Sequence, residues 1–273
     1  MKIHPLQTGT VRVKQFQLTG APHNLSRFFQ LAFTDKWSEW MPIYSWLIEH
    51  KNGYILIDTG ETADIYKEGY LPKGGLYHKA VQTKIEEGEE IDAQLQKIGL
   101  KPADISTVIL THMHGDHIGG LSYFEHADIY VSTAEFKFAS SSNGEANGYF
   151  QKNWPAWFAP HMVDFTGGAE GPFASSQRIP SLENLILVPT PGHSIGHMSV
   201  IIQEEETSYF IAGDLTYNLD TLKKEIADVV LMNDAAKQSV YLAKEYATSN
   251  DTIFLSSHDW NAPKLLEEGI FVN

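Results

Sequence analysis

The stretch Thr-His-Met-His-Gly-Asp-His-Ile-Gly-Gly at residues 111–120 constrains the fold and chemistry of this chain more than any other. Six consecutive positions carry three imidazoles and one carboxylate: His112, His114, Asp116 and His117. On a regular helix or strand these side chains would point in different directions, so they can converge only where the chain turns. Gly115 gives such a turn its backbone freedom. Imidazole nitrogen and carboxylate oxygen are ligands of Zn²⁺ and similar ions, so the motif predicts a metal site.

The residues just before the motif indicate where it lies in the fold. Thr107, Val108, Ile109 and Leu110 form an apolar run that predicts a buried strand. The motif would then follow the carboxyl end of that strand, where open α/β sheets bind their ligands. The alternative is a solvated histidine-rich loop. So many metal-binding side chains in one turn favour the functional interpretation.

The composition limits the class of protein. The chain has 273 residues, 42% of them hydrophobic, and no linker or repeat divides it, so we expect one domain over residues 1–273. Lys and Arg number 20 against 34 Asp and Glu, and the net charge of −14 argues against nucleic acid as a partner. The absence of cysteine excludes disulfides, thiolate metal ligands and a cysteine nucleophile.

The apolar segments of the sequence match neither an export signal nor a membrane span. The first ten residues lack the apolar core of a signal peptide. No window approaches the ~18 apolar residues of a membrane span. We therefore expect a cytoplasmic protein with no membrane partner.

Apolar runs bounded by turn residues predict strands in both halves of the chain. They cover residues 44–48, 54–57, 107–110, 129–131, 185–188, 198–202, 209–212 and 252–255. Lys51-Asn52-Gly53 predicts a hairpin between the first two. Helices are expected late in 79–98, ending at Gly99, and near 220–227 and 235–247. This order predicts the α/β class, with two sheets packed face to face and helices outside. Residues 133–178 are less regular and rich in aromatic side chains.

Further polar residues stand at the ends of predicted strands: Asp58, His193, Asp214 and His258. Together with the 112–117 motif, this ordered set resembles the metallo-β-lactamase superfamily over residues 43–259. The resemblance implies a four-layer αβ/βα sandwich of two mixed β-sheets, with one or two metal ions at one edge.

The resemblance also implies a role for each residue of the set. The ligands of a first ion would be His112, His114 and His193. The ligands of a second ion would be Asp116, His117 and His258. Asp214 would bridge the two ions, whose mutual repulsion requires a negative group between them. Asp58 would orient a ligand histidine from behind, and His197 would support the site in the same way or be structural. Gly192 and Gly196 would let the backbone pass close to the ions.

Within the superfamily, the N-acyl homoserine lactonases are the most similar subgroup. Thr-Pro-Gly-His-Ser-Ile-Gly-His-Met-Ser at 190–199, Ile-Leu-Ile-Asp-Thr-Gly at 55–60 and Tyr217 carry this similarity. In that subgroup a tyrosine three residues after the bridging aspartate hydrogen-bonds the substrate. The alternative for Tyr217 is an aromatic side chain that only packs beneath a strand.

The expected function is quorum-quenching hydrolysis of a lactone by two divalent ions. The ions would be Zn²⁺, with Fe, Mn or Co as alternatives, because this ligand set accepts all four. A hydroxide shared by the ions would attack the lactone carbonyl. Asp116 would shuttle the proton to the leaving oxygen, and Tyr217 would donate to the oxyanion. The partner would thus be a small lactone or ester.

An acyl-chain substrate requires an apolar wall. The candidates are the aromatic residues at 149–158 and a second group: Phe28, Phe29, Leu31, Phe33, Trp37 and Trp40. Such stretches also form cores or the contact between two copies of a homodimer.

Other functions on the same fold remain alternatives. A glyoxalase II-like thioesterase would require cationic residues near the C-terminus, where only Lys264 follows residue 259. A β-lactamase would require a lysine for the antibiotic's carboxylate, and Lys223 and Lys224 stand in no recognisable pattern. Ester or phosphotriester hydrolysis is open to the same hydroxide. A non-catalytic metal-binding scaffold is the alternative from another class, although it does not require a complete two-metal ligand set.

Overall fold

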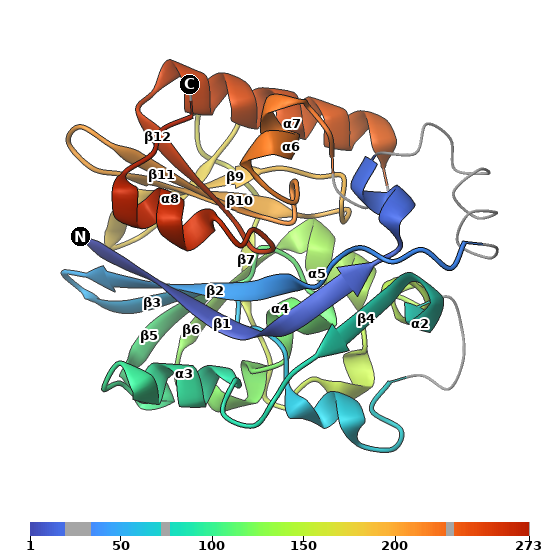
Figure 1. The fold of residues 1–273 in the computed structure, drawn as a ribbon. Helices are drawn as coiled ribbons and strands as arrows, with labels where there is room; N and C mark the ends of the chain where they lie inside the picture. The colour runs from blue at the N-terminus through green and yellow to red at the C-terminus, as the bar shows by residue number, and fades with distance from the viewer. Residues whose placement is uncertain (20–33, 72–76, 228–231, 273) are drawn as a thin grey trace.

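The computed structural model describes residues 1–19, 34–71, 77–227 and 232–272 (Figure 1). Its strands form two mixed sheets. The seven-stranded sheet has the order β4-β1-β2-β3-β5-β6-β7, with β1 (Lys2–Val13), β2 (Met41–His50), β3 (Gly53–Ile57), β4 (Val81–Lys84), β5 (Ile105–Ile109), β6 (Asp128–Ser132) and β7 (His161–Val163). The five-stranded sheet has the order β12-β11-β10-β9-β8, with β8 (Gln177–Ile179), β9 (Leu182–Pro189), β10 (Met198–Gln203), β11 (Ser208–Gly213) and β12 (Thr252–Ser256).

Helices of modest length connect the strands. The α-helices are α2 (Tyr77–Ala80), α3 (Ile91–Lys97), α4 (Gly115–Ile118), α5 (Thr133–Ala139), α6 (Leu219–Lys223), α7 (Asn233–Ser249) and α8 (Ala262–Glu268). Short 3₁₀ turns are η1 (Gln15–Thr19), η2 (Ala63–Tyr66), η3 (Pro102–Asp104), η4 (Leu121–Tyr123), η5 (Glu145–Asn147) and η6 (Gln151–Asn153). None of the helices that the structure describes is long and apolar enough to cross a membrane.

Alternation of side chains along the strands explains the four layers. Trp46 and Leu187 point into the core between the two sheets, whereas their neighbours Leu47 and Ile186 point outward. The outer face of the seven-stranded sheet packs against α3, and the outer face of the five-stranded sheet packs against α6 and α7 (Figure 1). Both faces of each sheet are therefore covered. The predicted α/β sandwich of two face-to-face mixed sheets is confirmed.

The predicted strands are all present, and several are longer than the patterns indicated. β2 and β3 pair antiparallel across the Lys51-Asn52 turn, as expected for a hairpin. Several elements lack a predicted counterpart, among them β1, β4, β7, β8 and α8. The helix expected near 220–227 ends earlier, at Lys223, and Glu225 has a φ of +56° that a helix does not accept.

The less regular segment at 133–178 contains short elements. It begins with α5 and includes η5, η6, β7 and the start of β8. α5 begins where the Ser132 side chain accepts a hydrogen bond from the backbone of Glu135, a normal helix N-cap. This helix brings Glu135 behind the loops described next.

Candidate metal centre

The predicted site residues come together at one edge of the two sheets. Asp58 follows β3, and the 112–117 motif follows β5 and leads into α4. His193 lies in the loop after β9, Asp214 directly follows β11, and His258 lies just beyond β12. Because the strands of both sheets end at this edge, residues far apart in the chain meet there.

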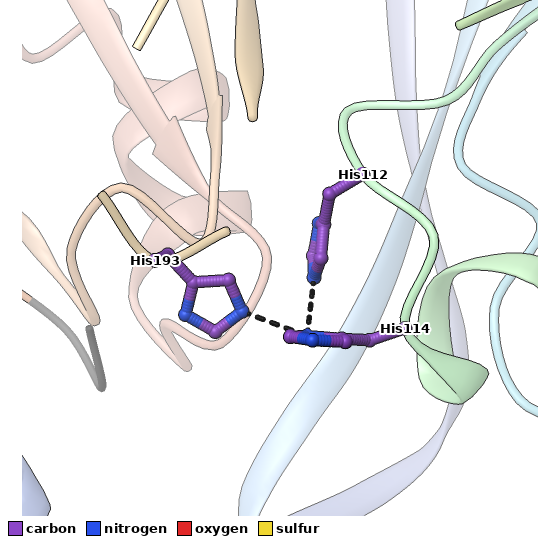
Figure 2. Close-up of side chains that lie close together, drawn as sticks. All are labelled: His112, His114 and His193. Carbon is purple, nitrogen blue, oxygen red and sulfur yellow. Dashed lines mark hydrogen bonds between the residues drawn. The ribbon is translucent and has the colours of Figure 1, made fainter. Parts of the chain in front are cut away.

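Three imidazoles converge on one point (Figure 2). His114 Nδ1 lies 3.0 Å from His112 Nε2 and 2.9 Å from His193 Nε2. Zn–N bonds of about 2.0–2.1 Å in tetrahedral geometry place ligand nitrogens roughly 3.3 Å apart. The three nitrogens are thus grouped closely enough to ligate one ion. We call them the three-histidine group.

A second group lies beside the first. The side chains of Asp116, His117 and His258 have ligand atoms close enough to hold one ion. Asp116 Oδ2 lies 3.8 Å from His117 Nε2 and 3.7 Å from His258 Nε2. We call these three residues the mixed group.

The carboxylate of Asp214 faces both groups. Its Oδ1 lies 3.2 Å from His117 Nε2, and its Oδ2 lies 3.2 Å from His258 Nε2. The same Oδ2 lies 3.5 Å from His193 Nε2 and 4.0 Å from His112 Nε2. One carboxylate therefore stands within reach of two candidate ion positions.

Buried polar atoms at the centre fit a bound cation. His117 Nε2 and Asp214 Oδ1 are shielded from solvent, and neither makes a hydrogen bond to any part of the chain that the structure describes. Leaving buried polar atoms unpaired costs about 1–3 kcal/mol each. A cation between imidazole nitrogen and carboxylate oxygen removes this cost, so the residues fit the ions that the resemblance implies.

Hydrogen bonds behind the histidines direct their free nitrogens inward. Asp58 Oδ2 accepts from His117 Nδ1 at 2.8 Å and from the Thr111 hydroxyl at 2.8 Å. Because that hydroxyl donates to Asp58, it accepts from His112 Nδ1, 3.1 Å away. His258 Nδ1 donates to the carbonyl of Pro42 at 2.8 Å. In the neutral form of each ring, Nε2 then carries no proton and is free to ligate.

His197 supports Asp214 from behind. The backbone N–H of Asp214 donates to His197 Nε2 at 3.0 Å. His197 Nδ1 must then carry the proton, and it lies 2.9 Å from the Thr190 hydroxyl. Burial lowers the pKa of His197 to about 4, so the ring stays neutral and keeps this arrangement near pH 7.

The two groups differ in charge. Burial lowers the pKa of His112 and of His193 well below 6.5 and also lowers that of His114. Burial opposes the charge on His117 as well, but three carboxylates, that of Asp214 foremost, raise its pKa well above 6.5. The three-histidine group is therefore neutral, the form that binds metal.

Asp214 and His258 carry opposite charges. Burial lowers the pKa of His258, but the charge of Asp214 outweighs it and raises that pKa to about 9. Burial raises the pKa of Asp214, but His258 and His117 hold it well below 3.8. Asp214 is thus ionised and surrounded by positive charge, as a carboxylate that binds cations would be.

Two glycines permit the close packing around His193. Gly192 has a φ of +147°, and a Cβ there would overlap the backbone of Ala236. A Cβ on Gly196 would overlap the backbone nitrogen of Glu135. Both positions require glycine for this reason, as the sequence predicted for a backbone that turns tightly here.

The structure also places Tyr217 and part of the predicted apolar wall. Tyr217 is buried, and its backbone carbonyl accepts from the Ser256 hydroxyl at 2.9 Å. Trp37 and Trp40 stack on the cation of Arg12, at 5.2 and 4.6 Å from the ring centroids. Four residues of the predicted wall lie outside the described residues: Phe28, Phe29, Leu31 and Phe33.

The aromatic side chains at 149–158 divide between the core and the site. Trp154, Trp157 and Phe158 pack against the hydrophobic cluster outside the seven-stranded sheet. Tyr149 is fully buried, and its ring lies 4.8 Å from that of His114. Its hydroxyl donates to Glu135, a residue that the sequence pattern did not single out.

Known proteins resemble this chain in sequence. An N-acyl homoserine lactonase of Bacillus cereus is 26% identical over 220 residues, which cover 80% of this chain and 82% of that protein. A probable metallo-hydrolase of Mycobacterium tuberculosis is 28% identical, over 81% of this chain and 71% of its own length.

Solved structures share the fold. An N-acyl homoserine lactone hydrolase with the product N-hexanoyl-L-homoserine bound at its catalytic metal centre superposes with a TM-score of 0.74 at 23% identity, covering 96% of this chain and 95% of that one. The dizinc quorum-quenching lactonase AidC superposes with a TM-score of 0.64 at 18% identity, covering 95% and 88%.

A match to a family model assigns the chain to a family, which the similarities to individual proteins do not do by themselves. The model of the metallo-beta-lactamase superfamily matches residues 38–258, which include all the candidate ligands described above. The match covers most of the chain and agrees with the two-sheet fold. This chain belongs to the metallo-beta-lactamase superfamily, whose members are metal-dependent hydrolases.

Proposed function

We propose that this protein opens the lactone ring of N-acyl homoserine lactones with the help of two divalent metal ions. The placement of Asp214 carries the proposal, because its two oxygens lie 3.2 Å from His117 Nε2 and 3.2 Å from His258 Nε2 while also facing the three-histidine group. A site for one ion does not require a carboxylate so placed. A site for two does, since the positive charges must be separated by a negative one.

The ions that we propose are Zn²⁺. The three-histidine group would hold one ion, the mixed group would hold the other, and Asp214 would bind both. The donor atoms are nitrogen and oxygen, which suit Zn²⁺ and also Fe²⁺, Mn²⁺ or Co²⁺. When bound, the ions would supply Lewis acidity and lower the pKa of a water molecule toward neutrality.

The residues of the chain would then carry the proton and steady the substrate. Asp116 would accept the proton from the attacking water and pass it to the ring oxygen that leaves. The water oxygen forms a new bond to the acyl carbon, and the ring C–O bond breaks. The hydroxyl of Tyr217 would donate a hydrogen bond to the carbonyl oxygen as negative charge develops there. The product carries one alcohol and one carboxyl group, which releases its proton to solvent and becomes a carboxylate.

Relatives support the choice of substrate. The Bacillus cereus protein bears the name N-acyl homoserine lactonase, and the structural relative holds an acyl homoserine product at its metal centre. Tyr217 stands three residues after Asp214, as in the lactonase subgroup. The biological consequence of this reaction would be quorum quenching.

Elemental analysis combined with a substrate panel tests the proposal. Purified protein should contain two equivalents of metal per chain and should hydrolyse acyl homoserine lactones of varied chain length. The same preparation should be assayed against a glutathione thioester, an aryl ester and a phosphotriester. Removal of the ions with a chelator should abolish turnover, and added Zn²⁺ should restore it.

The rival functions give different results in this panel. Faster turnover of the thioester would identify a thioesterase, and faster turnover of the phosphotriester would identify a phosphotriesterase. Two bound ions without hydrolysis of any substrate would identify a metal-binding scaffold. Full lactonase activity after chelation would contradict the two-metal proposal.

A further inference from the structure

Glu135 lies at the start of α5 with its side chain fully buried. A buried carboxylate is unfavourable unless it is paired or hydrogen-bonded. No Lys or Arg pairs with it among the residues that the structure describes. It is held instead by four hydrogen-bond donors, which come from two loops that carry candidate ligands and from one neighbouring aromatic residue.

Each oxygen of the Glu135 carboxylate accepts hydrogen bonds on one side of the three-histidine group. Oε1 accepts from the backbone N–H of Met113 at 3.1 Å and from the Tyr149 hydroxyl at 2.9 Å. Met113 stands between His112 and His114, and the Tyr149 ring lies beside the His114 ring. This oxygen therefore holds the two histidines that follow β5.

The other oxygen holds the loop from the five-stranded sheet. Oε2 accepts from the Ser194 hydroxyl at 2.7 Å and from the backbone N–H of Gly196 at 3.0 Å. Ser194 directly follows His193 in the chain. Since the two loops come from different sheets, the carboxylate joins the two halves of the three-histidine group.

The phenol of Tyr149 remains a donor. Burial, and then the charge of Glu135, raise its pKa above the usual value, so it keeps its proton at every pH at which the protein would be assayed. The phenol can therefore be removed by substitution with phenylalanine, which leaves the ring against His114. This provides a mild variant for testing the network.

We propose that Glu135 is a positioning residue of the three-histidine group, because its carboxylate fixes the spacing between the loop of His112 and His114 and the loop of His193. The inference rests on the proposed two-metal function. Glu135 touches none of the reacting atoms. It acts by holding three imidazole nitrogens at ligand spacing before an ion binds, which lowers the cost of binding.

The test measures metal binding and not activity alone. Wild type, Glu135→Gln, Tyr149→Phe and Ser194→Ala are stripped of metal and titrated with Zn²⁺ against a competing chelator. Glu145→Gln, the same change at an exposed position, is the matched control. Co²⁺ absorption spectra with one equivalent report the geometry at the first ion, and thermal unfolding of each metal-free protein reports its stability.

Glutamine places an NH₂ group against hydrogen-bond donors, so Glu135→Gln should lower the affinity for the first ion roughly 10–100-fold and alter the Co²⁺ spectrum. Tyr149→Phe and Ser194→Ala should each produce a smaller loss of the same kind. Unchanged first-ion affinity and Co²⁺ spectra in these variants, with or without a loss of thermal stability, would overturn the inference. If Glu135→Gln does not fold, Tyr149→Phe and Ser194→Ala test the inference by the same two measurements, first-ion affinity and the Co²⁺ spectrum.

Failure of the proposed function would look different. Wild type that binds no metal, or that binds two ions and hydrolyses nothing, contradicts the function itself. Wild type that binds two ions and hydrolyses lactones, beside variants with unaltered first-ion affinity, contradicts only the role of Glu135.

Discussion

His117 Nδ1 lies 2.8 Å from Asp58 Oδ2, although 59 positions separate the two residues in the chain. Asp58 has a φ of +60°, an unusual backbone conformation that turns its side chain back beneath the motif. Its carboxylate also accepts from the backbone and the hydroxyl of Thr111, both at 2.8 Å. A single buried carboxylate thereby orients His117 directly and His112 through Thr111.

Replacing Asp58 should therefore weaken metal binding without removing a ligand. In Asp58→Asn an amide group would face donors, and His117 would lose its fixed orientation. We expect a 10–100-fold loss of affinity for the second ion, as is typical when a residue behind a metal ligand is changed. Competition titration with Zn²⁺ measures it, with the exposed Asp35→Asn as control. Equal affinity in both variants would show that Asp58 has no part in metal binding.

Asp214→Asn tests the bridge between the ions. The amide is neutral and would no longer offset the repulsion between two divalent cations. We expect the metal content to fall from two equivalents to one, because the three-histidine group retains its own ligands. Elemental analysis gives the content, and circular dichroism checks that the variant is folded. A folded variant that still holds two ions would refute the bridging role.

Tyr217→Phe separates catalysis from metal binding. Loss of one donor to a developing oxyanion costs about 10²–10³-fold in kcat in other hydrolases. We expect a loss in this range for lactones at an unchanged metal content. Steady-state kinetics together with elemental analysis check both values. Loss of metal in this variant would mean that the tyrosine supports the ligands and does not act on the substrate.

The affinity for the second ion should depend on pH. His258 has a pKa of about 9 in the folded metal-free protein, above its usual 6.5, so its charged form stabilises that state fully below pH 6.5, and this contribution is lost as pH rises through 9. An ion binds only the neutral ring and must displace the proton. His117, the other histidine of the mixed group, also has a raised pKa and must lose a proton as well. Affinity should therefore rise by about tenfold per pH unit for each proton displaced, up to about pH 9 for His258.

The first ion provides the internal comparison for this pH series. Burial already lowers the pKa of His112 and of His193 well below 6.5, so no proton has to leave these rings at neutral pH. Zn²⁺ titrations between about pH 6 and 9 should show a steep dependence for the second ion and a shallow one for the first. Parallel slopes for the two ions would contradict the assignment of His258 to the second.

Much of the fold could be predicted from local patterns. Runs of apolar residues bounded by turns located the inner strands, because buried strands require continuous hydrophobic side chains. β1 escaped prediction because Pro5 and Gly9 interrupt its pattern, and its register shifts between Gln7 and Thr10. α8 escaped because it spans only Ala262–Glu268, too few residues for a helical periodicity to stand out.

The sequence by itself determined the candidate ligands, because five histidines and two aspartates occur in motifs in which residue type and spacing indicate metal binding. Only the tertiary structure decided how they are held. The parts played by Thr111, Glu135 and Pro42 depend on contacts between residues distant in the chain, and no local pattern encodes such contacts. Packing of two sheets against each other brings these donors and acceptors together, and burial makes each unpaired group costly enough to fix their geometry.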